Sequence, residues 1–268
     1  MLTLIDLKEI INYKFFLFQL IYRNFSLIYK QTVLGPFWQI LNPLIQSGVF
    51  SLVFGEFAKI PTNGVPPFLF YSSAMVGWVL FHSSFLKTSN SLINSSYILR
   101  FAYFPKLIIP IAMIAESLIF FVIHFIIFIL VIFVYLLNGY ELNINWVGLS
   151  LLPLVILYIS LLSVFFGMII SCWGARYRDL LQIGSYGSQL LFYGTPIIYS
   201  MTSVPEKLHF LFYFNPLTYF IEYFRFVFFS TELPHISYLI TGIIFLIFIS
   251  IFSLHTFKNH TKNIIDYV

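Results

Sequence analysis

The chain has 268 residues, of which 60% are hydrophobic, 21% are aromatic and only 9% are charged. Soluble domains contain about 45–50% apolar residues, so this composition and the mean hydropathy of +0.92 exclude a soluble globular protein and indicate a chain surrounded by lipid. The single cysteine, Cys172, excludes an internal disulfide. The 14 Lys and Arg outnumber the 10 Asp and Glu. In a membrane protein such an excess reports topology, so we expect no nucleic-acid partner.

Residues 1–35 are predicted to form a cytoplasmic N-terminal segment that contains a surface helix and is retained, because no small-residue cleavage site is present. One helical face carries Leu17, Ile21, Phe25 and Ile28, and the opposite face carries Gln19, Arg23, Ser26 and Lys30. This pattern predicts an amphipathic helix along the membrane, with Arg23 and Lys30 directed toward water and anionic lipid headgroups. The alternative is a helix continuous with the first span, but Gly35-Pro36 indicates a break.

Six apolar runs follow that reach the length of about 20 residues needed to cross a bilayer. They cover residues 37–57, 68–86, 107–137, 146–173, 180–200 and 236–257. Two shorter pieces, 208–214 and 217–229, lie between the fifth and sixth runs and are separated by Asn215-Pro216. Neither piece can cross alone, and proline interrupts a helix, so we expect a re-entrant or interfacial helix pair on the outer side.

The distribution of basic residues supports this count. With the N-terminus in the cytoplasm, eleven Lys and Arg lie inside, namely Lys8, Lys14, Arg23, Lys30, Lys87, Arg100, Lys106, Arg176, Arg178, Lys258 and Lys262. Three lie outside: Lys59, Lys207 and Arg225. A seventh span at 217–229 would move Lys258 and Lys262 outside and weaken the bias. The prediction is an all-α integral membrane protein with a six-span domain at 36–257, a tail at 258–268 and both termini cytoplasmic.

The sequence contains no GxxxxGK[ST], HExxH, CxxC or GxSxG motif. We therefore expect no catalytic residues, no metal site and no cofactor or ATP bound by the chain alone. Glu116 and His124 are ionisable residues in the third run, and eight positions place them about 80° apart around a helix. They make a poor catalytic pair, so a place for Glu116 near an interface, or a bond from it to a neighbouring helix, is favoured over proton coupling.

Two polar segments interrupt the apolar pattern on the cytoplasmic side. In "WGARYRDLLQIGS", which begins at Trp173, Arg176, Arg178 and Asp179 fall within four positions. The second segment, "KTSNSLINSSYILRFAYFPK" at 87–106, has the length of a short surface helix. Among the aromatics, Trp38, Tyr193 and Tyr199 could line a glycan path, because aromatic faces pack on sugars and phenol groups form hydrogen bonds. The alternative is that they belong to an interfacial belt.

Four stretches together resemble a known family. They are "YKQTVLGPFWQILNPLI" at 29–45, "RYRDL" at 176–180, "FYGTPIIYS" at 192–200 and "YFNPLTYF" at 213–220. Their order and spacing are similar to those of type 2 ABC exporter permeases that move polysaccharides and polyol phosphates. The likeness is strongest to O-antigen export permeases, with capsule and teichoic-acid permeases as near relatives.

The resemblance implies a homodimer in the bacterial cytoplasmic membrane with two copies of a separate ABC ATPase, which binds ATP and Mg. It implies a lipid-linked glycan as cargo, on an undecaprenyl pyrophosphate carrier. Contacts with the ATPase are then expected from Arg176, Tyr177, Arg178, Asp179, Asn94 and Arg100. Pro196 joins Trp38, Tyr193 and Tyr199 in the expected translocation path.

Three alternatives stay open. The two arginines of the turn could anchor lipid headgroups instead of contacting a partner. A membrane-embedded transferase acting on lipid-linked sugars would need converging carboxylate, His or metal-ligand groups, and none are evident in the sequence. A proton-coupled secondary transporter or flippase would need several paired charges near mid-membrane, where Glu116 is the one plausible group.

Overall fold

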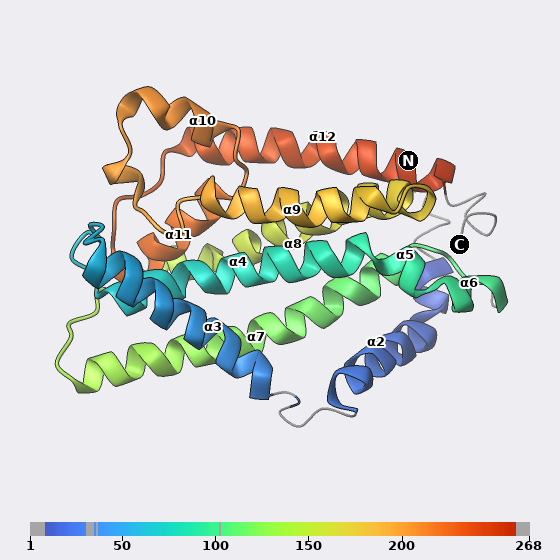
Figure 1. The fold of residues 1–268 in the computed structure, drawn as a ribbon, viewed down its shortest axis with the longest axis horizontal. Coiled ribbons are helices and arrows are strands. Elements are labelled where there is room, and N and C mark those ends of the chain that lie inside the picture. The colour runs from blue at the N-terminus through green and yellow to red at the C-terminus, as the bar shows by residue number, and fades with distance from the viewer. Residues whose placement is uncertain (1–8, 31–34, 36, 102, 261–268) are drawn as a thin grey trace.

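The computed structural model describes residues 9–30, 35, 37–101 and 103–260, and within these ranges it contains helices and no strands. The longer helices run side by side along the long axis of the molecule, and the short helices gather at its two ends (Figure 1). This arrangement agrees with the predicted all-α membrane protein.

Five helices of the described chain are long and apolar enough to cross a membrane: Ile40–Phe57, Pro67–Ser89, Ile108–Leu137, Trp146–Arg176 and Ile236–His260. The first comprises most of α3 (Phe37–Phe50) and a π-helix, η1 (Ser51–Phe57). The others are α4, α7, α8 and α12. They confirm five of the predicted runs. Helices α4 and α8 each continue three residues past the predicted end, into the polar segments that follow.

The predicted fifth run, 180–200, is helical only in its first part. Helix α9 (Asp179–Tyr193) has 15 residues, and Gly194 forms its C-cap. A helix of this length extends about 22 Å, less than the roughly 30 Å of a hydrocarbon core. Gly194 and Pro196 explain the early end, since glycine favours helix ends and proline offers no N–H donor.

The short helices fall where proline and polar residues interrupt the apolar pattern. After α9 come η2 (Met201–Ser203), η3 (Glu206–Leu208), α10 (His209–Tyr213) and α11 (Thr218–Phe229). Asn215 and Pro216 separate α10 from α11, as predicted. At the other end of the bundle, α5 (Ser91–Asn94) and α6 (Ser96–Phe101) fill the polar segment between α4 and α7, and α2 (Lys14–Tyr29) precedes α3.

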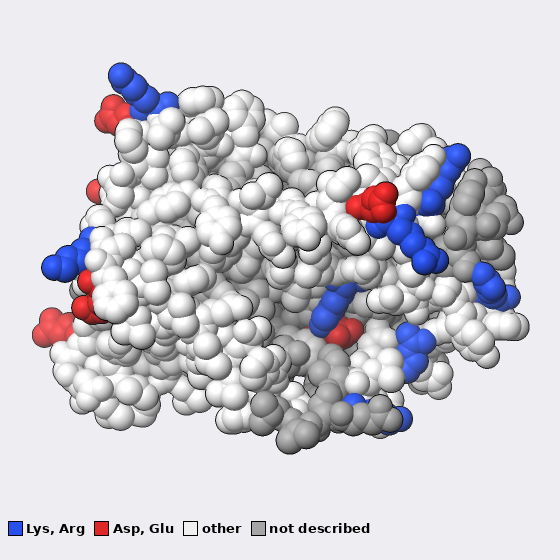
Figure 2. All heavy atoms as spheres, in the orientation of Figure 1, with Lys and Arg blue, Asp and Glu red and all other residues white. Residues whose placement is uncertain are grey.

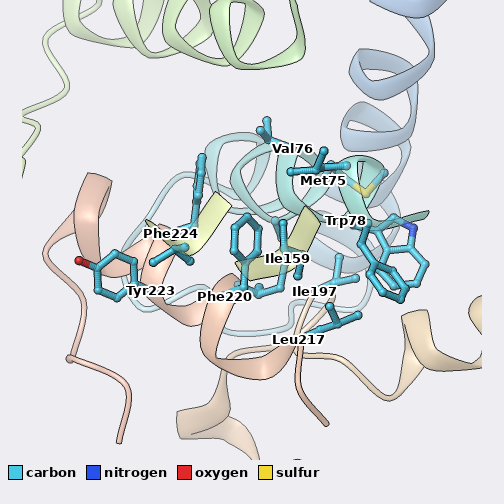
Figure 3. Close-up of a cluster of buried hydrophobic side chains, with 14 of the residues drawn as sticks. Met75, Val76, Trp78, Ile159, Ile197, Leu217, Phe220, Tyr223 and Phe224 are labelled. Carbon is cyan, nitrogen blue, oxygen red and sulfur yellow. The ribbon is translucent and has the colours of Figure 1, made fainter. Parts of the chain in front are cut away.

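The main core forms where α11 packs against α4 and α8 (Figure 3). Phe220, Phe224 and Phe228 recur every fourth residue on one face of α11, and all three are buried. Gly77 of α4 makes this approach possible, because a Cβ there would lie 1.8 Å from Cε1 of Phe220. The aromatic face of α11 is therefore enclosed by the bundle.

A second apolar cluster lies at the end of the bundle that carries α5 and α6. It draws one or more buried side chains from each of six helices: Leu20 of α2, Leu92 of α5, Leu99 of α6, Met113 of α7, Met168 of α8 and Phe257 of α12. Because protein interiors are close-packed, displacement of one of these helices is felt by the others. We call this group the end cluster.

Charged side chains gather at the two ends of the molecule, and a broad band between them is nearly free of charge on the visible face (Figure 2). Lys and Arg predominate at the end with α5 and α6, whereas the other end carries a mixture that includes several carboxylates. An uncharged band between two charged ends is the pattern expected of a protein that crosses a bilayer.

Candidate functional site

The predicted polar turn between the fourth and fifth runs is a tight connection with exposed side chains. Helix α8 ends at Arg176, Tyr177 is extended with φ −127° and ψ 94°, and Arg178 is the N-cap of α9. Arg176, Tyr177, Arg178 and Asp179 are all exposed. The Arg176 guanidinium lies 5.2 Å from the centre of the Tyr177 ring. Asp179 occupies the first turn of α9, where the helix dipole favours a carboxylate.

The second predicted polar segment is anchored to the same part of the bundle. Ser91 and Leu92 of α5 are buried, and the Leu92 N–H donates to Oγ of Ser171 at 3.3 Å. Ser171 lies five residues before Arg176 in α8. Asn94 and Arg100 remain exposed. The structure thus brings both polar segments to one end of the molecule, as the sequence predicted.

Helix α2 lies against α7 at this end. The Phe25 ring stacks on Phe120 with 5.5 Å between ring centres, and Leu20 is buried in the end cluster. Arg23 donates through Nη2 to Oδ1 of Asn24 at 2.9 Å, and Lys30 is exposed at the C-cap. Part of the predicted apolar face is therefore used for packing on protein.

Helix α2 also has a second, exposed apolar surface. Phe15, Phe18 and Tyr22 are 74%, 67% and 75% exposed. An exposed apolar surface of this kind is typical of a helix that lies at the boundary of the lipid. The contact of α2 with lipid stays a prediction.

An ion pair joins α4 and α7 beside the Phe120 ring, on which α2 packs. The Lys87 ammonium lies 2.7 Å from Oε1 of Glu116 and 4.5 Å from the centre of the Phe120 ring. The expectation that Glu116 bonds a neighbouring helix is confirmed. Just before α7, partial burial lowers the pKa of the Lys106 ammonium.

The predicted path residues do not all lie together. Tyr193, at the end of α9, is 64% exposed, and the Tyr199 hydroxyl donates to its carbonyl at 3.0 Å. Pro196, which lies between these two residues in the sequence, is buried. Trp38 stands at the start of α3, which begins near the middle of the long axis and runs toward the end that carries α10 and α11 (Figure 1). The structure groups Tyr193, Pro196 and Tyr199 and does not bring Trp38 to them.

Helix α9 carries an exposed polar stripe that sequence reasoning missed. Gln182, Tyr186, Gln189 and Tyr193 follow one another at steps of four, three and four residues, and all are exposed. These steps place the four side chains on one face of a helix. Amide groups are costly to expose to hydrocarbon, so this face requires polar partners. The periodicity of the two glutamines was the signal available in the sequence.

The break at Asn215-Pro216 has a structural function that the sequence did not show. The Asn215 side-chain amide donates to the carbonyl of Gly194 at 2.8 Å and to Oγ1 of Thr195 at 2.9 Å. The Tyr158 hydroxyl donates to the carbonyl of Pro216 at 2.9 Å. The residues between α10 and α11 therefore satisfy polar groups where the α9 helix stops.

Sequence reasoning also did not predict the burial of Arg225. The charge distribution puts it among the basic residues outside the membrane, but its side chain is 1% exposed and lies inside the bundle. The one feature of the sequence that indicated its burial was its position in a run of aromatic residues. Among the described residues, no group of three His, Cys, Asp or Glu side chains could hold a metal ion.

Residues 16–229 match the ABC-2 type transporter family. The chain is 28% identical over 228 residues to the O-antigen export system permease protein RfbA of Klebsiella pneumoniae, covering 83% of this chain and 84% of that protein. It is 23% identical over 229 residues to the protein of that name from Myxococcus xanthus, covering 85% of each. Because the family match covers most of the chain, as the resemblance of the four motifs predicted, this protein belongs to the ABC-2 type transporter family.

Proposed function

We propose that this chain is the membrane permease of an exporter that moves a lipid-linked polysaccharide across the bacterial cytoplasmic membrane. The relatives in Klebsiella pneumoniae and Myxococcus xanthus are named O-antigen export permeases, and the proposed cargo rests on that similarity. An undecaprenyl-pyrophosphate carrier is part of the proposal. A capsule or teichoic-acid polymer is the alternative cargo within the same family.

The observation that carries the proposal is the exposed polar face at the end of the bundle, built on the end cluster. Arg176, Arg178 and Asp179 offer groups for charge-assisted hydrogen bonds with a separate ABC ATPase, and α5 and α6 lie at the same end. A displacement of either polar segment would be transmitted to α2, α7, α8 and α12 through the apolar contacts that they share in the end cluster. ATP and Mg belong to the ATPase in this proposal.

The polar stripe of α9 supports a homodimer with a shared path. In a dimer, two such stripes can face each other and be hydrated, whereas in an isolated chain they would meet lipid. Tyrosine rings pack on sugar faces and amides bond sugar hydroxyls, so Tyr186, Gln189 and Tyr193 suit a passing glycan. Trp38 would line the inner part of the same path, and Tyr199 the outer part.

The proposed topology has six spans, with α9 and residues 194–200 together as the fifth and α10–α11 as a re-entrant pair. Both termini are then cytoplasmic. Single cysteines at exposed Ser203 and Glu232, each in a Cys172→Ala background, should both react with an impermeant maleimide from outside. Reaction of the two positions from opposite sides would require an extra span and would overturn this topology.

Co-purification tests the function itself. The chain is expected to hydrolyse no ATP alone and to support hydrolysis and glycan export when joined by an ATPase encoded beside it. A host that lacks its own O-antigen permease, supplied with this pair, should display polymer on its surface. A matched pair with the ATPase inactivated in its phosphate-binding loop controls for expression. Strong ATP hydrolysis by the isolated chain, or export without the ATPase, would refute the proposal.

A further inference from the structure

The backbone between α9 and η2 lacks the hydrogen bonds that a helix would supply. Residues 194–200 follow the end of α9, and Thr195, Pro196, Ile197 and Ile198 are buried. We call residues 194–200 the irregular segment. Backbone carbonyls that are buried away from water need partners, and at membrane depth such a segment is tolerated only where protein provides them.

Arg225 provides these partners from α11. Its Nη1 donates to the carbonyl of Pro196 at 2.7 Å, and its Nη2 donates to the carbonyl of Ile197 at 2.9 Å. Nη1 also lies 3.4 Å from the carbonyl oxygen of Tyr199. The planar guanidinium fork suits adjacent acceptors in a way that a lysine ammonium does not.

Glu222 completes this arrangement one helical turn earlier. Its carboxylate accepts from Nη1 of Arg225 at 3.0 Å and also from the backbone N–H of Met201. The guanidinium lies 3.6 Å from the centre of the Phe70 ring of α4. Two charged side chains of α11 therefore hold both the carbonyls of the irregular segment and the residue that follows it.

We propose that Arg225 and Glu222 are positioning residues that fix the irregular segment to α11, so that Tyr193 and Tyr199 keep their places at the outer end of the transport path. The proposal rests on the function proposed above. The hydrogen bond from the Tyr199 hydroxyl to the Tyr193 carbonyl transmits the position of one tyrosine to the other. The segment and α11 then shift as one body when the outer end rearranges.

Maleimide labelling of a cysteine introduced at position 198 tests this placement. Ile198 is buried in the irregular segment, so Ile198→Cys in a Cys172→Ala background should react slowly in right-side-out membrane vesicles. Arg225→Ala removes several charge-assisted hydrogen bonds, and the labelling rate should rise by about tenfold or more because the segment opens locally. Arg225→Lys should give an intermediate rate. Lys207→Ala, which removes an exposed charge at the same end, should leave the rate unchanged.

Native Cys172 separates a local effect from unfolding. It is 2% exposed in the end cluster, at the opposite end of the bundle. With Cys172 as the one cysteine, Arg225→Ala should leave it protected from a permeant maleimide in the same vesicles. Exposure of both Cys172 and the cysteine introduced by Ile198→Cys would make Arg225 a general stability element and overturn the proposal. Unchanged labelling of the introduced cysteine in Arg225→Ala and Arg225→Lys would overturn it as well.

Export measurements link the positioning to transport. In complex with the ATPase, Arg225→Lys should reduce glycan export several-fold while ATP hydrolysis continues, because the outer end is disturbed and the polar face is intact. Equal loss of both activities would contradict a role confined to the outer end. The labelling assay needs neither glycan nor ATPase, so it still tests the placement of the segment if the proposed cargo or partner is wrong.

Discussion

Two groups of charged side chains, one at each end of this molecule, have opposite surroundings. At the end with α5 and α6, Arg176, Arg178 and Asp179 are exposed, and α8, which ends at Arg176, packs in the apolar end cluster. At the other end, Glu222 and Arg225 are buried and support backbone that has no regular structure. Removing exposed charges changes the free energy of unfolding little. Such charges are, however, available for contact with a partner. Buried charges are costly to separate and determine local conformation.

The sharpest test of this comparison makes the same chemical change at both ends. Glu222→Gln removes the negative charge beside buried Arg225, and breaking a buried pair typically costs about 3–5 kcal/mol. Asp179→Asn at the exposed turn should change stability by less than about 0.5 kcal/mol. Thermal unfolding of the two detergent-purified variants measures the difference. Equal shifts in the unfolding midpoint would remove the distinction between the two ends.

A second test addresses the packing that holds α11 in place. Gly77→Ala places a Cβ 1.8 Å from the Phe220 ring, and such overpacking costs about 1–3 kcal/mol. Gly48→Ala is the matched control, since its Cβ would lie 3.8 Å from Phe68, an ordinary contact. Adding Phe220→Leu to Gly77→Ala should restore part of the lost stability. Full stability of Gly77→Ala would show that α11 can move away from α4 without penalty.

The polar turn should show the reverse profile, with little effect on stability and a large effect on export. The double change Arg178→Ala with Asp179→Ala should keep unfolding within about 0.5 kcal/mol of the parent chain. Hydrogen bonds to charged groups are worth about 1.5–3 kcal/mol, so their loss at an interface should weaken the ATPase contact. Surface glycan and the amount of co-purified ATPase measure this effect. Normal values of both would refute a coupling role for the pair.

The smallest change separates a specific contact from an electrostatic anchor. Arg176→Lys keeps the positive charge that headgroups would attract but loses the planar fork. If Arg176 contacts a partner, Arg176→Lys should export as poorly as Arg176→Ala. If the residue anchors lipid, Arg176→Lys should export normally and Arg176→Ala should not. Export assays on matched expression levels distinguish these outcomes, with stability expected to be unchanged in both variants.

The end of α9 shows why part of the site was out of reach of sequence reasoning. Hydropathy continues through Ile197 and Ile198, so the predicted apolar run extends to Ser200. The helix stops at Tyr193 because Gly194 and Pro196 end it and because side chains elsewhere satisfy the backbone groups that follow. Those side chains, Asn215 and Arg225, lie about 20 to 30 positions later in the chain. No local pattern records such a partnership.

The sequence by itself determined the lipid environment, the five long helices, the two polar segments and the break at Asn215-Pro216. Each depends on local composition, apolar run length or proline chemistry, which act over a few helical turns. Tertiary structure alone decided that Arg225 is buried, that Glu116 pairs with Lys87, and that Gly77 admits Phe220. The physical reason is that burial and partnership depend on which helices pack together, and apolar helices of similar composition carry little information about their neighbours.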